Sequence, residues 1–496
     1  MKSMKFITCL LLLGLTNTLI GAKESTLKLD TVYADFNKDF KMYVTPRHDY
    51  TKTYVTKLFM CSSGFDGRFK RRDNGSQKLY MNCEQALEII KGMDEITMGM
   101  PKVVYLVGWQ YLGHDSKYPA FFEGNEAIKR PQDSNALESL KWLMAEAKKY
   151  NTSVSVHINM IDAYEDSPLW DKYVANNVIA RTETGALRGG EWGYPISYAQ
   201  EWKLGFTQER IDKLCEILPI QEAGTIHIDA YHSAVPNPIK KENGEWDIEM
   251  QSPISPFLDF TQEDEIKAQR NIIKYFDSKG IDVTTEGVPQ GKLLGIFDGY
   301  QTMGWWFKGE DLYLKYTANQ ICGGCDHYSD WGKLFGTNLN AEQIFMKGHG
   351  SDTFAEFKMK FCTMTLIFNY LNRFDRLYRV EGENYKAVQF SNGVHTELFN
   401  GRFILRKGKT ILVEDNDVCI PAQWLGENKN LILYSEKGYK KRTWKLPDSF
   451  PEEGSVTLYE VTENGKKRIG VKKISNQKIT IGLKANEMLL VEFKKQ

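Results

Sequence analysis

The sequence predicts an α/β fold, a (β/α)8 TIM-type barrel followed by a C-terminal all-β sandwich. From about residue 100 to 380, short β-branched runs alternate with helical stretches, which is typical of a parallel sheet with crossover helices. After about residue 385, short strands follow one another without a helical period between them. A chain of 496 residues is long enough to hold a barrel and a smaller partner domain.

Residues 1–22 have the pattern of a signal peptide. Lys2 and Lys5 precede an apolar run at 6–15, and Gly21-Ala22 offers a small-residue cleavage point. The run is too short to span a membrane, so we expect export without insertion, to the periplasm, the cell surface or the medium. A lipoprotein signal is the alternative, but Cys9 stands inside the apolar run.

The barrel is expected over 23–385, with a strand-rich segment at its N-terminal end. Helical periodicity marks one face of 134–149 and one face of 262–278, and Gly280 closes the second helix. Four β-branched runs are predicted as parallel strands, at 103–107, 153–158, 225–228 and 281–285.

The sandwich is expected over 386–496. Asn-Gly pairs at 400–401 and 464–465 are typical of hairpin turns. The predicted strands lie at 403–405, 410–413, 431–433, 456–459 and 488–491.

The composition excludes several classes of protein. With 64 basic and 64 acidic residues, the chain lacks the cationic excess that nucleic acids and anionic membranes require. The 11 Trp, 25 Tyr and 26 Phe residues offer flat apolar surfaces of the kind that sugar-binding clefts use. The sequence leaves the oligomeric state open.

Metal and disulfide chemistry have little support. The eight histidines never occur as HxH or HExxH, so we expect no metal and no cofactor. Seven cysteines remain after the signal peptide, an odd and thinly spread set. Cys322 and Cys325 form a single CxxC, which is typical of two core or loop cysteines or of a local disulfide.

Two acids close predicted strands and are the candidate catalytic residues. Asp229 ends the run at 225–228, and Glu286 follows the run at 281–285. Barrel enzymes carry their catalytic groups at the C-terminal ends of strands, and cleavage of a glycosidic bond needs two carboxyl groups. The alternative is that both acids make structural hydrogen bonds at strand ends.

Candidate substrate-binding residues surround these acids in the sequence. Trp109 offers an apolar face to a sugar ring, and the pair His114-Asp115 can hold vicinal hydroxyl groups. Trp192 and Tyr194 lie in a glycine-rich loop that can form a cover over a bound sugar. Loop aromatics also serve as packing plugs, and an isolated His-Asp pair is commonly a loop hydrogen bond. Tyr231 follows Asp229 closely and completes the set.

Several ordered motifs resemble the endo-α-N-acetylgalactosaminidases, glycoside hydrolase family 101. The strand ends IHIDAY (226–231) and VTTEG (283–287) are similar to the family's nucleophile and acid/base strands. VGWQ and GHDSKYP within 107–119 resemble its substrate-gripping segment, and GGEWGYPISY (189–198) resembles its lid loop. TWKLPDSF (443–450) and VTLYEVTENG (456–465) resemble the domain after the barrel, so the likeness spans roughly 100–490.

The resemblance implies Asp229 as nucleophile and Glu286 as acid/base, His114 and Asp115 as hydroxyl ligands, and Trp192 as part of a cover. The family releases Gal-β-1,3-GalNAc from Ser or Thr of mucin-type glycoproteins, with retention, so a glycan or glycoprotein is the expected partner. This chain is shorter than typical members, has Tyr194 where a second Trp is expected, and has an insertion-like segment at 235–257 after the nucleophile strand.

Two alternatives stay open at this point. An exo-acting α-N-acetylgalactosaminidase, as in the related family 129, fits the same residues. A non-catalytic exported glycan-binding protein would explain the aromatic residues and the sandwich, but it would not require two acids at strand ends.

Overall fold

The computed structural model describes most of the chain between residues 43 and 493. The described ranges are 43–64, 76–189, 193–231, 253–286, 321–322, 329–426 and 429–493, with the backbone of short strands at 28–30, 239–240, 246–247 and 302–303. The predicted signal peptide, Trp192 and Cys325 lie outside these residues.

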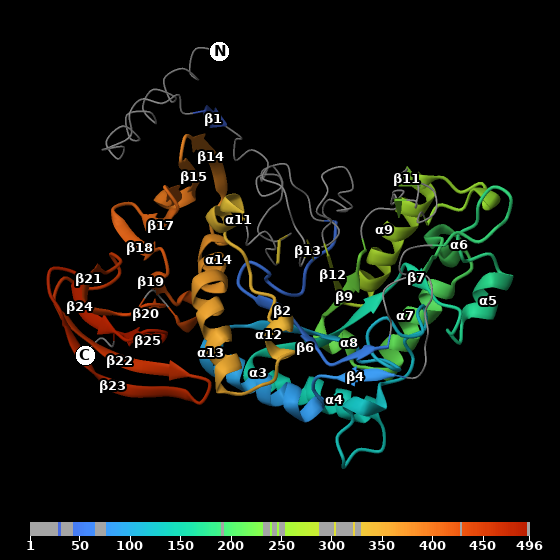
Figure 1. The fold of residues 1–496 in the computed structure, drawn as a ribbon, viewed down its shortest axis with the longest axis horizontal. Helices are drawn as coiled ribbons and strands as arrows, with labels where there is room; N and C mark the ends of the chain where they lie inside the picture. Colours follow the sequence, from blue (N-terminus) through green and yellow to red (C-terminus); the bar gives the residue numbers. More distant parts are fainter. Residues whose placement is uncertain are drawn as a thin grey trace.

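A six-stranded parallel sheet forms the centre of the described structure (Figure 1). Neighbouring strands follow one another in chain order, and every pair is parallel. The predicted parallel sheet is therefore confirmed, and its first strand comes from the segment before residue 100. The strands are β2 (Tyr54–Phe59), β5 (Lys102–Val107), β6 (Thr152–Asn159), β9 (Thr225–Asp229), β12 (Asp282–Thr285) and β13 (Thr302–Met303).

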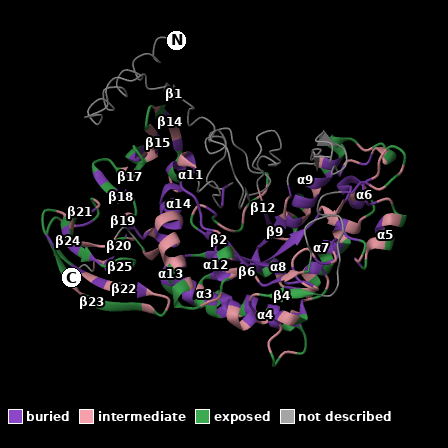
Figure 2. Cartoon of the chain, in the orientation of Figure 1, coloured by how far each residue is buried: buried purple, intermediate pink, exposed green. Residues whose placement is uncertain are grey.

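Helices between these strands pack on one face of the sheet. The best-defined start is that of α9, where Thr261 and Asp264 form a capping box, and Gly280 turns the chain with φ +79° after the helix. Apolar side chains of these helices join the strands in one large core. Figure 2 shows this buried layer. The helices are α3 (Cys83–Thr97), α4 (Ala136–Ala147), α7 (Phe206–Ile217), α8 (Ile220–Ala223) and α9 (Gln262–Ser278), with α5 (Trp170–Ala175) and α6 (Tyr198–Lys203) further out.

A second helical group lies between the parallel sheet and the C-terminal strands (Figure 1). It comprises α11 (Asp330–Phe335), α12 (Glu342–Phe345), α13 (Ser351–Lys360) and α14 (Leu366–Leu371), and a π-helical turn joins the last two. Helix α12 packs on β2, whereas α11 packs on the first C-terminal strands. The same apolar core therefore continues from one sheet to the other.

The C-terminal region forms a large antiparallel sheet, as the all-β prediction required. The sheet begins before residue 386 and also takes in β1 (Lys28–Asp30). Both predicted Asn-Gly turns join adjacent strands of this sheet. In spatial order after β1, the strands are β14 (Arg376–Gly382), β15 (Tyr385–Phe390), β16 (Val394–Phe399), β17 (Arg402–Lys407), β18 (Thr410–Glu414), β19 (Asp417–Pro421), β20 (Asn430–Ser435), β25 (Glu487–Glu492), β22 (Gly454–Thr462) and β23 (Gly465–Ile474).

A smaller sheet covers part of the large one. Its strands β21 (Tyr439–Lys445) and β24 (Lys478–Leu483) contribute Trp444 and Ile479 to a second apolar cluster with Leu433 and Val491 of the large sheet. Three more two-stranded pairs are β3 (Cys61–Ser63) with β4 (Gln77–Leu79), β7 (Asp162–Ala163) with β8 (Tyr194–Pro195), and β10 (Ile239–Lys240) with β11 (Trp246–Asp247).

The described residues contain six parallel strands, so the closed eight-stranded barrel stays a prediction. The C-terminal sandwich also stays a prediction. Within the same residues, no helix combines the length and the apolar character needed to cross a membrane.

Candidate active site

The two faces of the parallel sheet differ sharply in chemistry. Side chains alternate along a strand, so Val104, Val156 and Ile226 face the helices and join the large apolar core. The residues between them carry polar groups: His157 of β6 stands in register with His227 of β9. Because buried polar side chains need partners, this second face is where chemistry is expected.

Asp229 and Glu286 meet at the C-terminal end of this polar face. Strands β9 and β12 are adjacent and parallel, with Ile228 opposite Thr285, so their ends lie side by side. The side chains of Asp229 and Glu286 are 19% and 17% exposed, which leaves both carboxyl groups accessible to a ligand. The structure therefore brings together the two acids predicted from the sequence.

The surroundings set the two carboxyl groups at different pKa values. Burial raises the pKa of Glu286 to about 7; the cation of Lys57 opposes this rise, and the charge of Asp229 adds to it. Burial also opposes ionisation of Asp229, but His157, Lys57 and His114 outweigh it and hold the pKa of Asp229 well below its usual range. At neutral pH one group is an ionised carboxylate and the other can carry a proton.

Lys57 is a third charged group of the site, and it is not among the site residues predicted from the sequence. It lies on β2 with its side chain 5% exposed, and its Nζ lies 2.5 Å from Oε1 of Glu286. Burial works against its charge, but Glu286, Glu342 and Asp229 raise the pKa of Lys57. A lysine within the apolar strand YVTKLF is the signal that could have identified it, because lysine is rarely buried without a partner.

His157 lies beside the other carboxylate. Its Nε2 is 3.5 Å from Oδ1 of Asp229, and the ring is buried. Burial and the charge of Lys57 lower the pKa of His157 to about 4, so the ring is neutral at pH 7. In the sequence, His157 stands out only as a polar residue near the end of the predicted strand at 153–158.

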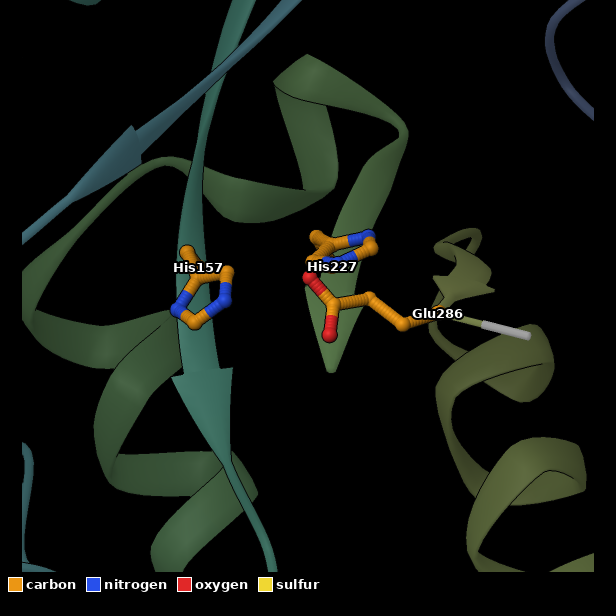
Figure 3. A group of neighbouring side chains, drawn as sticks. All are labelled: His157, His227 and Glu286. Carbon is orange, nitrogen blue, oxygen red and sulfur yellow. The ribbon is translucent and has the colours of Figure 1, made fainter. Parts of the chain in front are cut away.

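Three imidazole rings line the floor beneath the carboxyl groups. The ring centroids of His114 and His157 are 5.3 Å apart, and those of His157 and His227 are 5.2 Å apart. Figure 3 shows the carboxyl group of Glu286 pointing toward the rings of His157 and His227. His227 shares a 2.9 Å hydrogen bond between its Nδ1 and Oγ1 of Thr284, which fixes the ring from the neighbouring strand.

The predicted pair His114-Asp115 does reach the acids. The backbone N–H of His114 donates to the carbonyl oxygen of Cys61, just after β2, at 2.9 Å. Gly108 allows this packing, because a Cβ there would lie 1.8 Å from the same carbonyl oxygen. Ligand atoms of His114, Asp115 and Asp229 all lie within 4.8 Å of one another. Groups that can hold hydroxyls thus stand beside the ionised carboxylate.

Two of the predicted aromatic residues, Trp109 and Tyr231, do not face the site. Trp109 is fully buried and donates its indole N–H to the carbonyl oxygen of His157 at 3.0 Å. Tyr231 is also fully buried, and its hydroxyl donates to the carbonyl oxygen of Gln269. Neither ring offers an exposed face to a sugar, and both belong to the core behind the site.

Tyr194 lies on β8 and is partly exposed. Its ring centroid is 5.0 Å from that of Trp170, and its hydroxyl donates to Oε1 of Glu165 at 3.1 Å. These contacts anchor the tyrosine within its own hairpin region, and the adjoining Trp192 lies outside the described residues.

Two sets of side chains in the site have the spacing of metal ligands. One is His157, His227 and Glu286, and the other is His114, Asp115 and Asp229. The ammonium of Lys57 already supplies a positive charge to Glu286 at hydrogen-bond distance. We therefore assign neither set as a metal site.

Solved structures that are similar to this chain include two glycosidases. Among solved structures, the chain is similar to the α-N-acetylgalactosaminidase NagBb of Bifidobacterium bifidum, in a quadruple-mutant form, with a TM-score of 0.50 and 11% identity over 72% of this chain and 57% of that one. It is also similar to the family 36 α-galactosidase AgaB of Geobacillus stearothermophilus, with a TM-score of 0.46 and 12% identity over 88% and 55% of the two chains. The chain therefore spans little more than half the length of either protein.

No protein of curated function matches the sequence. Residues 77–247 match the family model described as endo-α-N-acetylgalactosaminidase, and this range includes His114, Asp115 and Asp229 and ends before Glu286. The resemblance seen in the sequence is thus confirmed for residues 77–247, which match the model of glycoside hydrolase family 101.

Proposed function

We propose that the protein is a retaining glycoside hydrolase that acts on α-linked GalNAc of mucin-type O-glycans and releases Gal-β-1,3-GalNAc from Ser or Thr. The observation that carries this proposal is the pair Asp229 and Glu286, two adjacent and partly exposed carboxyl groups with opposite pKa shifts. A glycosidase needs one carboxylate and one carboxylic acid at neutral pH.

In the proposed mechanism, Asp229 attacks the anomeric carbon while Glu286 donates a proton to the leaving oxygen. Glu286 then removes a proton from water, which attacks the same carbon and releases Asp229. The charge of Asp229 acts on Glu286, which supports the closer spacing of a retaining pair: retaining carboxyl groups stand about 5–5.5 Å apart and inverting ones about 6.5–9.5 Å apart.

The substrate class is supported by the family match and by the polar groups beside Asp229. In the proposal, His114 and Asp115 hold hydroxyl groups of the sugar bound at the nucleophile. NagBb is named an α-N-acetylgalactosaminidase, so an exo-acting enzyme of this specificity is the second candidate. A binding protein without turnover is disfavoured because it would not need two acids with split pKa values.

We extend the proposal to the architecture. A parallel sheet whose strands follow chain order, without a reversal, is what part of a (β/α)8 barrel would show. We propose a barrel over 23–385 and a β-sandwich over 386–496. The pattern at 1–22 supports export.

One assay separates the candidates. The full chain is incubated with Gal-β-1,3-GalNAc-α-aryl and with GalNAc-α-aryl glycosides side by side, and the released aryl alcohol is measured. Release from the disaccharide substrate alone indicates endo action, and release from the monosaccharide substrate alone indicates exo action. Release from neither would contradict the proposal, and Asp229→Asn serves as the inactive control.

A further inference from the structure

Lys57 is a buried cation that faces both carboxyl groups of the site. Its Nζ lies 2.5 Å from Oε1 of Glu286, and the charge of Asp229 acts on it as well. Other titratable groups around these three are His114 and Asp115 beside Asp229, His157 on β6, His227 on β9 and Glu342 on α12. His157 and His227 have lowered pKa values because they are buried, so Lys57 supplies the positive charge.

The charges of these three groups balance before the reaction. With Glu286 protonated, Asp229 carries one negative charge and Lys57 one positive charge. When Asp229 bonds to the sugar, the bond from the anomeric carbon to the leaving oxygen breaks and Glu286 gives its proton to that oxygen. Asp229 is then a neutral ester and Glu286 is the carboxylate, so the negative charge has moved while Lys57 stays in place.

We propose that Lys57 is a positioning residue for Glu286, an inference that rests on the proposed function. By pairing with the carboxylate that forms in the first step, Lys57 allows Glu286 to act as the base of the second step. A carboxylate formed in a buried site is costly unless a cation pairs with it. Lys57 is already in contact with Glu286, so the new carboxylate forms beside its partner. Water then gives its proton to Glu286, its oxygen bonds to the anomeric carbon, and the electron pair of the broken ester bond returns to Asp229.

Another buried lysine shows what a purely structural pair looks like. Lys102, at the start of β5, pairs with Asp94 and also donates to the carbonyl oxygen of Met100 at 2.8 Å. Its partners lie at the opposite end of the sheet from Glu286. Lys102→Met is therefore a matched control for Lys57→Met, because each variant removes one buried ammonium from the same sheet.

The kinetic test uses the aryl glycoside with the best leaving group that the wild type hydrolyses, so that the first step needs little acid. For Lys57→Met we expect kcat to fall about 10²-fold, KM to fall with it, and one equivalent of aryl alcohol to appear in a burst. Azide, which needs no general base, should restore kcat. Lys57→Arg should recover turnover, and Lys102→Met should show no burst.

An equal loss of kcat and kcat/KM in Lys57→Met, without a burst and without azide rescue, would overturn the role in the second step. A wild type that hydrolyses no α-GalNAc glycoside would instead count against the proposed function.

A second measurement needs neither turnover nor a folded Lys57→Met variant. In Asp229→Asn the neutral amide imitates the ester of the intermediate, and the titration of Glu286 is followed by NMR with glutamate labelled with ¹³C at the carboxyl carbon. We expect the pKa of Glu286 in Asp229→Asn to fall below 4.5, the ordinary pKa of a glutamate, because burial alone would hold it above that value and only the cation of Lys57 can bring it lower. A pKa that stays above 4.5 would overturn the proposal.

Discussion

Asp282, which is buried, and Glu286, whose side chain is partly exposed, lie at opposite ends of the polar face of one sheet, and their surroundings differ. Asp282 accepts hydrogen bonds from the backbone N–H groups of Arg47 and His48 and from the hydroxyl of Tyr50, at 2.8–3.1 Å. Glu286 has a cation on one side and a second carboxyl group on the other, and its side chain is partly exposed.

A raised pKa does not by itself distinguish these two ends. Burial raises the pKa of Asp282 as well as that of Glu286. It also raises the pKa of Glu265 to about 8, although that carboxyl group accepts from the hydroxyl of Ser197 and the N–H of Ala199. Asp282 and Glu265 are satisfied by donors of the chain itself, so they hold the fold together. Glu286 shares its site with a like charge, which marks it for chemistry.

The largest expected effect is that of Asp229→Asn, which removes the nucleophile and changes the side-chain volume little. We expect kcat on every α-GalNAc glycoside to fall about 10⁴-fold or more. Asp282→Asn, the matching change at the other end of the sheet, should leave kcat close to the wild-type value. Wild-type turnover by Asp229→Asn in a steady-state assay would show that Asp229 is not the nucleophile.

Glu286→Gln should affect substrates according to their leaving groups. Natural alkoxide leaving groups need protonation, so their release should slow by about 10²–10⁴-fold, whereas activated aryl glycosides should still form the intermediate. Added azide should then yield an α-glycosyl azide, the product of attack on a β-linked intermediate. Product anomers can be assigned by NMR, and a β-azide would refute the assigned roles.

The pH dependence of kcat/KM should follow the two pKa values of the free enzyme. Glu286 must be protonated, so activity should fall about tenfold per pH unit above pH 7. Asp229 must be ionised, so the acid limb should lie below pH 3.8, the ordinary pKa of an aspartate. The measurement uses a substrate with a poor leaving group, and Glu286→Gln should lack the basic limb. A basic limb that persists in this variant belongs to another group.

Asp282→Asn should have the smallest effect on activity. It should nevertheless lower the stability of the protein. The amide N–H₂ group would face N–H and O–H donors that now donate to a carboxyl group. We expect the free energy of unfolding to fall by about 1.5–3 kcal/mol, the range for hydrogen bonds to charged groups. Urea denaturation measures this change. If kcat fell with stability unchanged, the two ends of the sheet would not differ in the way described here.

The periodicity of apolar residues and the acids at strand ends predict the central strands and the two candidate catalytic residues from the sequence alone. β-branched runs located strands β5, β6, β9 and β12, because alternation with helices is a local property of the sequence. Asp229 and Glu286 were identified for the same reason, since an acid after an apolar strand is visible without knowledge of its neighbours. Their pairing followed from the general rule that parallel strand ends meet at one edge.

The direction of side chains just beyond a strand was decided only by the tertiary structure. Trp109 and Tyr231 were expected to face a sugar, yet both are buried. Each follows a residue with a positive φ, Gly108 at +74° and Ala230 at +45°, where the chain turns and the alternation of the strand no longer applies. Such a turn is not encoded by the spacing of apolar residues.

Lys57 shows most clearly what the sequence determined and what it did not. Its position within an apolar strand is evident from the sequence alone and indicates a buried charge that needs a partner. The partner, Glu286, lies 229 residues further along the chain. In strand order alone, β2 and β12 are four strand-to-strand steps apart, about 19 Å in a flat sheet, which is too far for the two side chains to meet. Only the curvature of the sheet brings Lys57 and Glu286 into contact, and no local pattern records that curvature.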